Sequence, residues 1–426
     1  MIAKAERERI IALMQREVIP AIGCTEPIAV ALCVARATEL LGVRPTQIQV
    51  RLSANVLKNA MGVGIPGTGM IGLPIAVALG ATVGRSAYGL EVLRDVTDGA
   101  VAEAKQLIEQ KAIAISLKEG CVEKLYIEVE VEADAHHAVA IIAGGHTHFV
   151  YCAHDGQVQL DKREASAEEE QAEEPNLCME RVWEFAMSAP LEEIGFILES
   201  QRLNKGAAET SFAGEYGHCV GKTIRLDPTS VIGDSIFAHI LANTSAACDA
   251  RMAGAMVPVM SNSGSGNQGI AATLPVVTYA EDTHASQEAL TRALALSHLT
   301  VIYIKQSLGR LSALCGCVVA ATGSSCGITY LMGGGYAEVC SAVKNMIANL
   351  TGMICDGAKP SCALKLTSGV STAVLSAILA MQGRCVTSVE GIIDEDVDTC
   401  IRNLTTIGRE GMDETDRLVL NMMTDK

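Results

Sequence analysis

The 426-residue chain has few aromatic side chains, although almost half of it is hydrophobic. Phe, Trp and Tyr make up 3% of the sequence and hydrophobic residues 49%, so the core must be built mainly from aliphatic side chains, Ala, Met and Cys. Together with 39 glycines, this composition favours closely packed helices joined by permissive turns. A chain of this length and apolar content has ample material for a core, which excludes disorder as its dominant state.

Positive charge and long hydrophobic runs are also scarce. The net charge of −16 repels polyanions, which argues against a nucleic-acid or anionic-membrane partner. Apolar runs such as 27–35 and 69–84 are shorter than the roughly 20 residues of a membrane span or are broken by Gly and Pro. The first nine residues lack the pattern of a signal peptide. We expect a cytoplasmic protein with a small-molecule substrate, and a homo-oligomer is compatible with this.

Hydrophobic periodicity changes twice along the chain. Helical spacing predominates up to about residue 111, for example over 25–41, and again after residue 176, for example over 336–350. The stretch 112–160 alternates as strands. We therefore predict an α+β fold, in which a predominantly helical domain carries an inserted small antiparallel β-sheet lobe. The predicted divisions are an N-terminal helical part (1–111), the lobe with an acidic linker at its end (112–175), and a second helical part (176–426).

Three of the 15 cysteines stand out from the rest. An odd cysteine count without a secretory signal argues against a disulfide framework, and most of these residues are expected to be small buried hydrophobes. Cys315 lies in LSALCGCVVAATG, and Cys355 and Cys362 bracket the Gly- and Pro-containing loop of MICDGAKPSC. Such a loop can wrap a metal centre, although the C-x6-C spacing alone does not distinguish a metal site from two structural cysteines.

A fourth cysteine and two glycine-rich loops complete the set of candidates. Cys24 precedes a predicted helix N-cap in AIGCTEPIAV, where the helix dipole favours a thiolate that acts as base or ligand; a buried cysteine at a turn is the alternative. The two G-x-G-x-x-G strings, at 62–67 and 264–269, lack the strand-turn-helix context of a dinucleotide site. Their backbone N–H groups could instead hold a small carboxylate, or the glycines could serve tight turns alone.

Six strings together resemble the L-cysteine desulfidase family, which is related to the alpha chain of iron–sulfur L-serine dehydratases. They are AIGCTEPIAVAL, SANVLKNAMGVGIPGTGMIGLP, IAGGHTHFV, SNSGSGNQG, LSALCGC and GMICDGAKPSCALK, and the likeness spans nearly the whole chain. The resemblance implies a [4Fe-4S] cluster held by Cys315, Cys355 and Cys362, with one iron open to the substrate and Cys24 as the base. Cys317 is a second candidate for the first ligand. Unlike the related dehydratases, this chain ends in NMMTDK, without a cysteine tail.

The implied reaction is α,β-elimination of L-cysteine to sulfide, ammonia and pyruvate. The sequence has no pyridoxal-phosphate signature, so the open iron would act as the electrophile. Thr68, Ser263 and Asn267, in or beside the glycine-rich loops, are expected to position the substrate carboxylate. An L-serine or L-threonine dehydratase with the same cluster and a non-catalytic cluster-binding relative remain as alternatives.

The nine histidines form no H-E-x-x-H motif. His136 and His137, and likewise His146 and His148, fall in the predicted lobe. For these pairs, exposure on alternating strands is favoured over metal binding.

Overall fold

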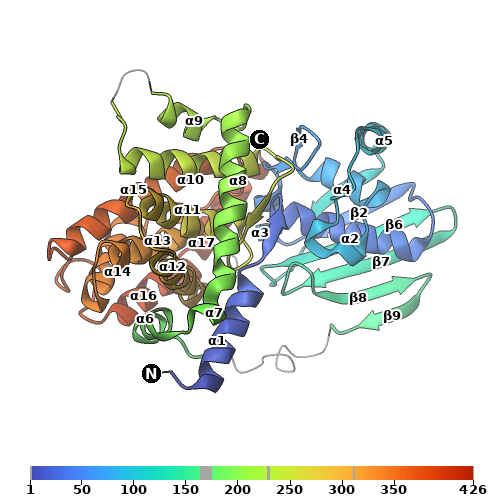
Figure 1. Ribbon diagram of the computed structural model, residues 1–426. Coiled ribbons are helices and arrows are strands. Elements are labelled where there is room, and N and C mark those ends of the chain that lie inside the picture. Colours follow the sequence, from blue (N-terminus) through green and yellow to red (C-terminus); the bar gives the residue numbers. More distant parts are fainter. Residues whose placement is uncertain (1, 164–174, 228–230, 310–311, 426) are drawn as a thin grey trace.

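The computed structural model describes residues 2–163, 175–227, 231–309 and 312–425 and has two parts, a helical body and a β lobe (Figure 1). This confirms the predicted α+β, predominantly helical class. The predicted helices at 25–41 and 336–350 are α2 (Thr25–Leu41) and α14 (Tyr336–Leu350).

The helical body contains the N-terminal helix and the second half of the chain. Its helices are α1 (Lys4–Glu17), α6 (Met179–Ser188), α7 (Leu191–Ile194), η2 (Gly195–Leu198), α8 (Glu199–Ala213), α9 (Val220–Arg225), α10 (Ile236–Met252), α11 (Gly266–Asp282), α12 (Gln287–Leu308), α13 (Gly316–Leu331), α14, α15 (Cys362–Met381), α16 (Val397–Thr406), η3 (Ile407–Gly411) and α17 (Asp413–Thr424).

Helix α13 packs against α11, α12, α14 and α15. Its small residues make this crowding feasible: a Cβ on Gly323 would lie 2.4 Å from the carbonyl oxygen of Ser297 on α12, and one on Gly327 would lie 2.7 Å from a Val276 methyl on α11. The abundance of glycine and alanine is thus explained by close helix packing around α13.

The β lobe is a six-stranded sheet whose strands lie in the order β5-β2-β6-β7-β8-β9. The strands are β2 (Gln47–Leu52), β5 (Ile113–Leu117), β6 (Tyr126–Ala133), β7 (His136–Ala143), β8 (Phe149–His154) and β9 (Gln157–Asp161). Helix α2 packs on β6 and β7, while α4 (Leu73–Thr82) packs on α2 and on α5 (Asp98–Glu109). The 3-10 helix η1 (Ser86–Glu91) lies against α2.

The lobe differs from its predicted form in three ways. Strand β2 pairs with both β5 and β6, so the lobe takes a strand and the helices α2, α4 and α5 from the segment before residue 112. Strand β5 runs parallel to β2, whereas β6 to β9 form the expected antiparallel meander. Apolar spacing predicts a helix over about 91–110, but α5 begins at Asp98, because Thr97 caps it by accepting a hydrogen bond from the Ala100 N–H. Most of the acidic linker, 164–174, lies outside the described residues.

Two short strand pairs and α3 (Ala54–Ala60) lie where the body meets the lobe. Strand β1 (Pro20–Ile22) pairs antiparallel with β10 (Pro258–Met260), and β3 (Gly64–Ile65) pairs with β4 (Met70–Ile71). The β1–β10 pair brings the start of α2 beside the loop 261–265, although the two segments are more than 200 residues apart in sequence.

Helix α15 is long and apolar enough to cross a membrane by length and composition. It packs against α10, α13 and α14, and 56% of its most apolar window is buried. These contacts are those of a core helix.

Candidate active site and metal centre

The structure brings all of the candidate cysteines to one cavity of about 90 Å³. The residues that line it are Cys24, Glu26, Asn59, Arg251, Ser265, Asn267, Cys315, Gly316, Cys317, Cys355, Gly357, Ala358, Cys362 and Lys365. This volume is well below the ~300–1,000 Å³ typical of sites for drug-sized ligands, so the cavity suits a small group rather than a nucleotide or pyridoxal phosphate.

Four helices begin at the cavity wall. Cys24, Ser265 and Cys315 are the N-cap residues of α2, α11 and α13, and Cys362 is the first residue of α15. Helix N-termini present unpaired N–H groups and partial positive charge. The cavity is therefore suited to an anionic occupant, such as thiolate ligands around a metal or a substrate carboxylate.

A backbone clamp places Cys315 beside Cys355, 40 residues later in the sequence. The Cys315 N–H donates to the Met353 carbonyl at 2.9 Å, and the Cys355 N–H donates to the Ala313 carbonyl at 2.6 Å. These bonds flank an antiparallel bridge between Leu314 and Ile354. The clamp positions two of the predicted ligands by main-chain bonds alone.

The loop that carries Cys355 and Cys362 is docked onto α3. Gly357 has φ +89°, and a Cβ there would lie 2.3 Å from the carbonyl oxygen of Lys58, so only glycine fits. The Lys58 ammonium is buried, donates to the Cys355 carbonyl at 3.4 Å and forms an ion pair with Asp416 of the C-terminal helix α17. Segments from the two ends of the chain thus hold this loop.

The cavity cysteines differ in their tendency to ionise. A hydrogen bond from Cys317 lowers the pKa of Cys315 to about 7 against the opposing effect of burial, so Cys315 ionises more readily than the other cavity cysteines. The corresponding interaction with Cys315, together with burial, raises the pKa of Cys317. Burial raises the pKa of Cys355, and that of Cys362 to about 11. Cys315 is therefore the better ligand of the adjacent pair, because a metal binds the thiolate.

Cys24 does not show the lowered pKa expected at a helix N-terminus. Burial and the negative charge of Glu26 raise the pKa of this thiol. Its Sγ donates to Glu26 Oε2 at 3.1 Å, and Glu26 is itself held by Thr25 Oγ1 at 3.0 Å and Asn59 Nδ2 at 3.1 Å. Desolvation outweighs the modest effect of one helix dipole. The nearest hydrogen-bond partner of the Cys24 thiol is thus a carboxylate, which disfavours the thiolate.

Glu26 is a site residue that the sequence did not reveal. Burial opposes its ionisation, but the charge of His146 and the hydrogen bonds from Cys24 and Thr25 outweigh burial and lower its pKa. His146 is buried and follows strand β7, so the β lobe supplies part of the charge balance at the site. The string IAGGHTHFV contained this histidine, but spacing alone could not show that it faces a carboxylate more than 100 residues away.

Arg251 is a second unforeseen residue. It lies at the end of α10, is 2% exposed, and donates from Nη1 to Asn267 Oδ1 at 3.0 Å. Among the described residues, its buried Nε has no hydrogen-bond partner, and neither has Asn59 Oδ1. Gly266 leaves room for the guanidinium, because a Cβ there would lie 2.2 Å from Arg251 Nε. Unsatisfied buried groups are costly, so the Arg251 Nε–H suits a hydrogen-bond acceptor such as an anion, and Asn59 Oδ1 suits a hydrogen-bond donor.

Of the three predicted carboxylate-binding residues, the structure brings only Asn267 to the cavity. The Thr68 hydroxyl closes its own turn by donating to the Ile65 carbonyl at 2.7 Å. Ser263 lines a different cavity with Glu17 and Lys305, and its Oγ donates to Asn262 at 2.8 Å.

The first glycine-rich loop serves close packing. A Cβ on Gly64 would lie 2.3 Å from the backbone of Ala253, and the Gly67 N–H donates to the Gly254 carbonyl at 3.3 Å. The glycines of this loop therefore serve tight turns and close packing, and not carboxylate binding.

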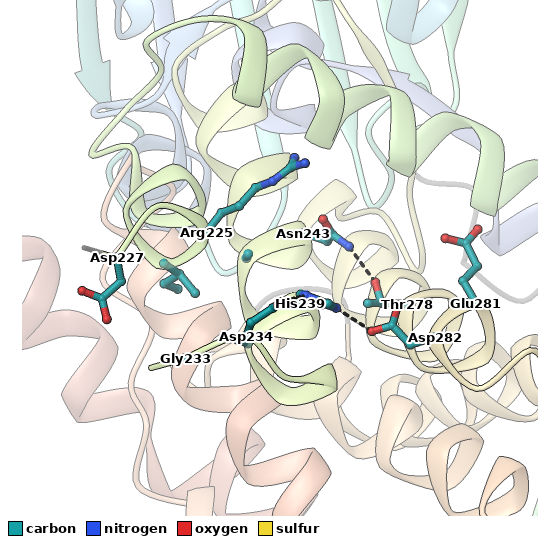
Figure 2. A pocket seen from close by; sticks show the side chains of 12 residues that line it. Arg225, Asp227, Gly233, Asp234, His239, Asn243, Thr278, Glu281 and Asp282 are labelled. Atoms are coloured by element: carbon teal, nitrogen blue, oxygen red, sulfur yellow. Dashed lines mark hydrogen bonds and ion pairs between the residues drawn. The ribbon is translucent and has the colours of Figure 1, made fainter. Parts of the chain in front are cut away.

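A larger cavity of about 590 Å³ lies elsewhere in the helical body, against α10 and α11 (Figure 2). Its side chains include His239, which contacts Asp282 at 2.7 Å, and Asn243, which donates to Thr278 at 3.1 Å. None of the predicted site residues lines it.

The chain matches the family of the serine dehydratase alpha chain over residues 87–421. It is 70% identical to a UPF0597 protein of Bacteroides fragilis over 99% of both chains, and 70% identical to one of Phocaeicola vulgatus over 100% of this chain and 99% of the other. A UPF0597 protein of Oleidesulfovibrio alaskensis is 46% identical over 99% of both chains.

Proposed function

Because the chain belongs to the serine dehydratase alpha chain family, we propose that it is a lyase that uses a [4Fe-4S] cluster to eliminate sulfide from L-cysteine. The products would be sulfide, ammonia and pyruvate. The observation that carries this proposal is the convergence of Cys24, Cys315, Cys355 and Cys362 at one small cavity beside Arg251.

The residues present fit the cluster. Cys315, Cys355 and Cys362 would hold it, with Cys315 already favoured as a thiolate by its neighbour Cys317. The N-termini of α13 and α15, together with Lys58 and Lys365, supply positive charge that offsets the negative charge of thiolate ligands. When bound through three cysteines, such a cluster supplies one iron with an open coordination position, which acts as a Lewis acid toward the substrate.

Arg251 is proposed to bind the substrate carboxylate. Its guanidinium is buried, has a free Nε among the described groups, and is oriented by Asn267. A guanidinium matches a carboxylate in charge and in planar geometry. Ser265, the N-cap of α11, lines the cavity next to Asn267. Its hydroxyl oxygen is proposed to accept a hydrogen bond from the substrate ammonium.

Cys24 and Glu26 are proposed to handle the proton. In the free site Cys24 is a thiol, so its proton must first pass to Glu26 along their 3.1 Å contact. The Cys24 thiolate then removes the Cα proton of the substrate, the electron pair forms the Cα=Cβ bond, and the Cβ–S bond breaks to release sulfide. The aminoacrylate product takes up water to give pyruvate and ammonia. A substrate ammonium near Cys24 would favour the thiolate.

The family match favours a second candidate, dehydration of L-serine by the same residues. The two reactions differ in the leaving group, sulfide or water. We favour L-cysteine because the sequence motifs resemble those of the L-cysteine desulfidase family. A reducing cytoplasm is the compartment that suits either reaction, since the thiolate ligands must stay unoxidised.

Anaerobic reconstitution with iron and sulfide, followed by removal of free sulfide and assay with L-cysteine and L-serine, tests the proposal. We expect pyruvate from both amino acids to be measurable, with a higher kcat/KM for L-cysteine and sulfide released in equal amount to pyruvate. The Cys385→Ser variant is a matched control, because Cys385 is half-buried and does not line the cavity. A higher kcat/KM for L-serine would establish the dehydratase, and no pyruvate from either would refute both.

A further inference from the structure

Two tight turns meet at one end of the lobe sheet, at the far end of β7 from His146. Pairing of Ala133 with His136 leaves a two-residue turn between β6 and β7, and pairing of His154 with Gln157 leaves another between β8 and β9. In the second turn Asp155 has φ +47° and Gly156 φ +77°, as in the hairpin turn typical of Asp-Gly. These turns fix His136, His154 and Asp155 at the sheet edge.

The strand register places the two histidines on one face. His154 pairs with Ala138, and His136 lies two residues before Ala138, so the two imidazoles are diagonal neighbours across β7 and β8. Their ring centroids are 6.0 Å apart. Asp155 lies between them: its Oδ2 is 2.6 Å from His136 Nδ1 and 3.5 Å from His154 Nε2.

One further contact orients the cluster, and one of its ring nitrogens has no hydrogen-bond partner among the described residues. The other carboxylate oxygen, Asp155 Oδ1, accepts the backbone N–H of His137 at 2.8 Å, which fixes the plane of the carboxylate. His154 Nε2 is buried and has no hydrogen-bond partner among the described residues. A buried ring nitrogen that points toward a carboxylate but forms no hydrogen bond leaves a donor position unused.

We propose that His136, His154 and Asp155 bind a divalent transition-metal ion of the zinc class. One donor atom from each residue lies within 4.8 Å of the other two. Ligand distances of roughly 2.0–2.2 Å around a tetrahedral ion put neighbouring donor atoms about 3.3–3.6 Å apart, so small side-chain shifts suffice. Two imidazoles with one carboxylate favour zinc, cobalt or nickel over magnesium or calcium, which prefer oxygen ligands.

This site is separate from the cysteine cavity. Strand β7 has His136 at its first residue, and its last residue, Ala143, leads to His146 beside Glu26. Eight strand residues span about 23 Å at roughly 3.3 Å per residue, so the ion would not contact the reacting groups. It would instead join the β6–β7 and β8–β9 hairpins and stabilise the lobe (Figure 1).

The test is zinc binding by the full-length protein after iron–sulfur reconstitution, which, on the proposed function, fills the ligand positions of Cys315, Cys355 and Cys362. After incubation with Zn²⁺ and gel filtration, we expect the His136→Ala/His154→Ala double variant to retain one zinc equivalent less than the parent. His148→Ala is the matched control, since His148 is an exposed histidine of the same lobe outside the cluster. The parent and control should also gain thermal stability with Zn²⁺, and the double variant should not.

A second variant addresses the geometry without removing an imidazole. Asp155→Asn keeps an oxygen that can accept the His137 N–H but removes the charge, so zinc affinity should fall at least about tenfold while unfolding without metal stays unchanged. Cobalt(II) bound at this site should show no thiolate-to-metal charge-transfer band. Equal zinc content in the parent and the double variant would overturn the proposal, whatever the cysteine cavity holds.

Discussion

The thiol of Cys24 donates a 3.1 Å hydrogen bond to Glu26 Oε2 at the first turn of α2. The two residues are close in sequence, yet their ionisation depends on the whole site. Burial and the carboxylate raise the pKa of Cys24, and His146 from the lobe helps to lower that of Glu26. The pair therefore holds a proton on sulfur and a negative charge on oxygen.

Replacing Cys24 should separate iron binding from activity. We expect Cys24→Ala and Cys24→Ser to keep most of the iron and to lose about 10²- to 10⁴-fold in turnover, because the proposed catalytic base is removed. Glu26→Gln should have a similar effect, since the amide cannot accept the Cys24 proton. Iron content and pyruvate release are measured on the same anaerobic samples. Nearly normal turnover would make Cys24 a packing residue, and iron loss in step with activity would make it a fourth ligand.

The adjacent cysteines Cys315 and Cys317 should behave differently. We expect Cys315→Ala, Cys355→Ala and Cys362→Ala to abolish iron binding and the broad visible absorbance of a thiolate-ligated cluster. Cys317→Ser should retain most of both, because a hydroxyl can still donate to the Cys315 thiolate. Iron content and visible absorbance are measured for each variant and for the parent protein after reconstitution. Full iron in Cys315→Ala with none in Cys317→Ser would reverse the assignment.

Arg251 should matter for substrate binding and not for the cluster. Arg251→Lys keeps the positive charge but loses the planar guanidinium. We expect kcat/KM to fall about 10- to 100-fold, which corresponds to the loss of one charged hydrogen bond. The iron content should stay unchanged. Arg225→Lys, at the other cavity, is the control. Steady-state kinetics with L-cysteine test this. Unchanged kcat/KM in Arg251→Lys would remove Arg251 from the carboxylate site.

His298 should make the stability of the protein sensitive to acid. Burial lowers its pKa to about 3, and its ring nitrogens contact Asn262 Nδ2 and Thr273 Oγ1, each at 3.0 Å. A depressed pKa means stability that is present above the unfolded value of roughly 6.5 and lost as pH falls toward 3.

The difference in unfolding free energy between the parent and His298→Gln should therefore shrink by up to about 1.4 kcal/mol per pH unit below about pH 6.5. Urea unfolding at pH 7, 6 and 5 measures this, with the exposed His148→Gln as control. A difference that stays constant with pH would contradict a neutral buried His298.

The iron-free protein should remain folded. Each part has a continuous apolar core, one built around α13 and one between α2 and the lobe sheet. The cavity cysteines are only a few of the many buried side chains in the first core, so most of its packing does not involve the cavity. We expect the iron-free protein to unfold in one cooperative thermal transition, measured by calorimetry or circular dichroism. A broad, non-cooperative transition would show that the cluster holds the fold together.

Local sequence features were sufficient for several elements. The apolar spacing over Tyr336–Leu350 and over Thr25–Leu41 predicted helices with the observed bounds, because periodicity acts within a few residues. The N-cap of α2 was wrong by one residue, since Cys24 itself is the N-cap. The division at residue 112 did not match the packing. Strand β2 carries no local mark of its partners, and its pairing with both β5 and β6 depends on contacts at long sequence separation.

The identity of the candidate cysteines was determined by the sequence, because Cys24, Cys315, Cys355 and Cys362 stand in specific strings. Only the tertiary structure decided what surrounds them. The β1–β10 pair, the 314–354 bridge and the docking of Gly357 on Lys58 bring remote segments together. Burial then reverses the ionisation expected for Cys24, and places Arg251 and Glu26 in the site while Thr68 and Ser263 lie outside it. Charge and desolvation act through space, so their balance is decided only once the chain has folded.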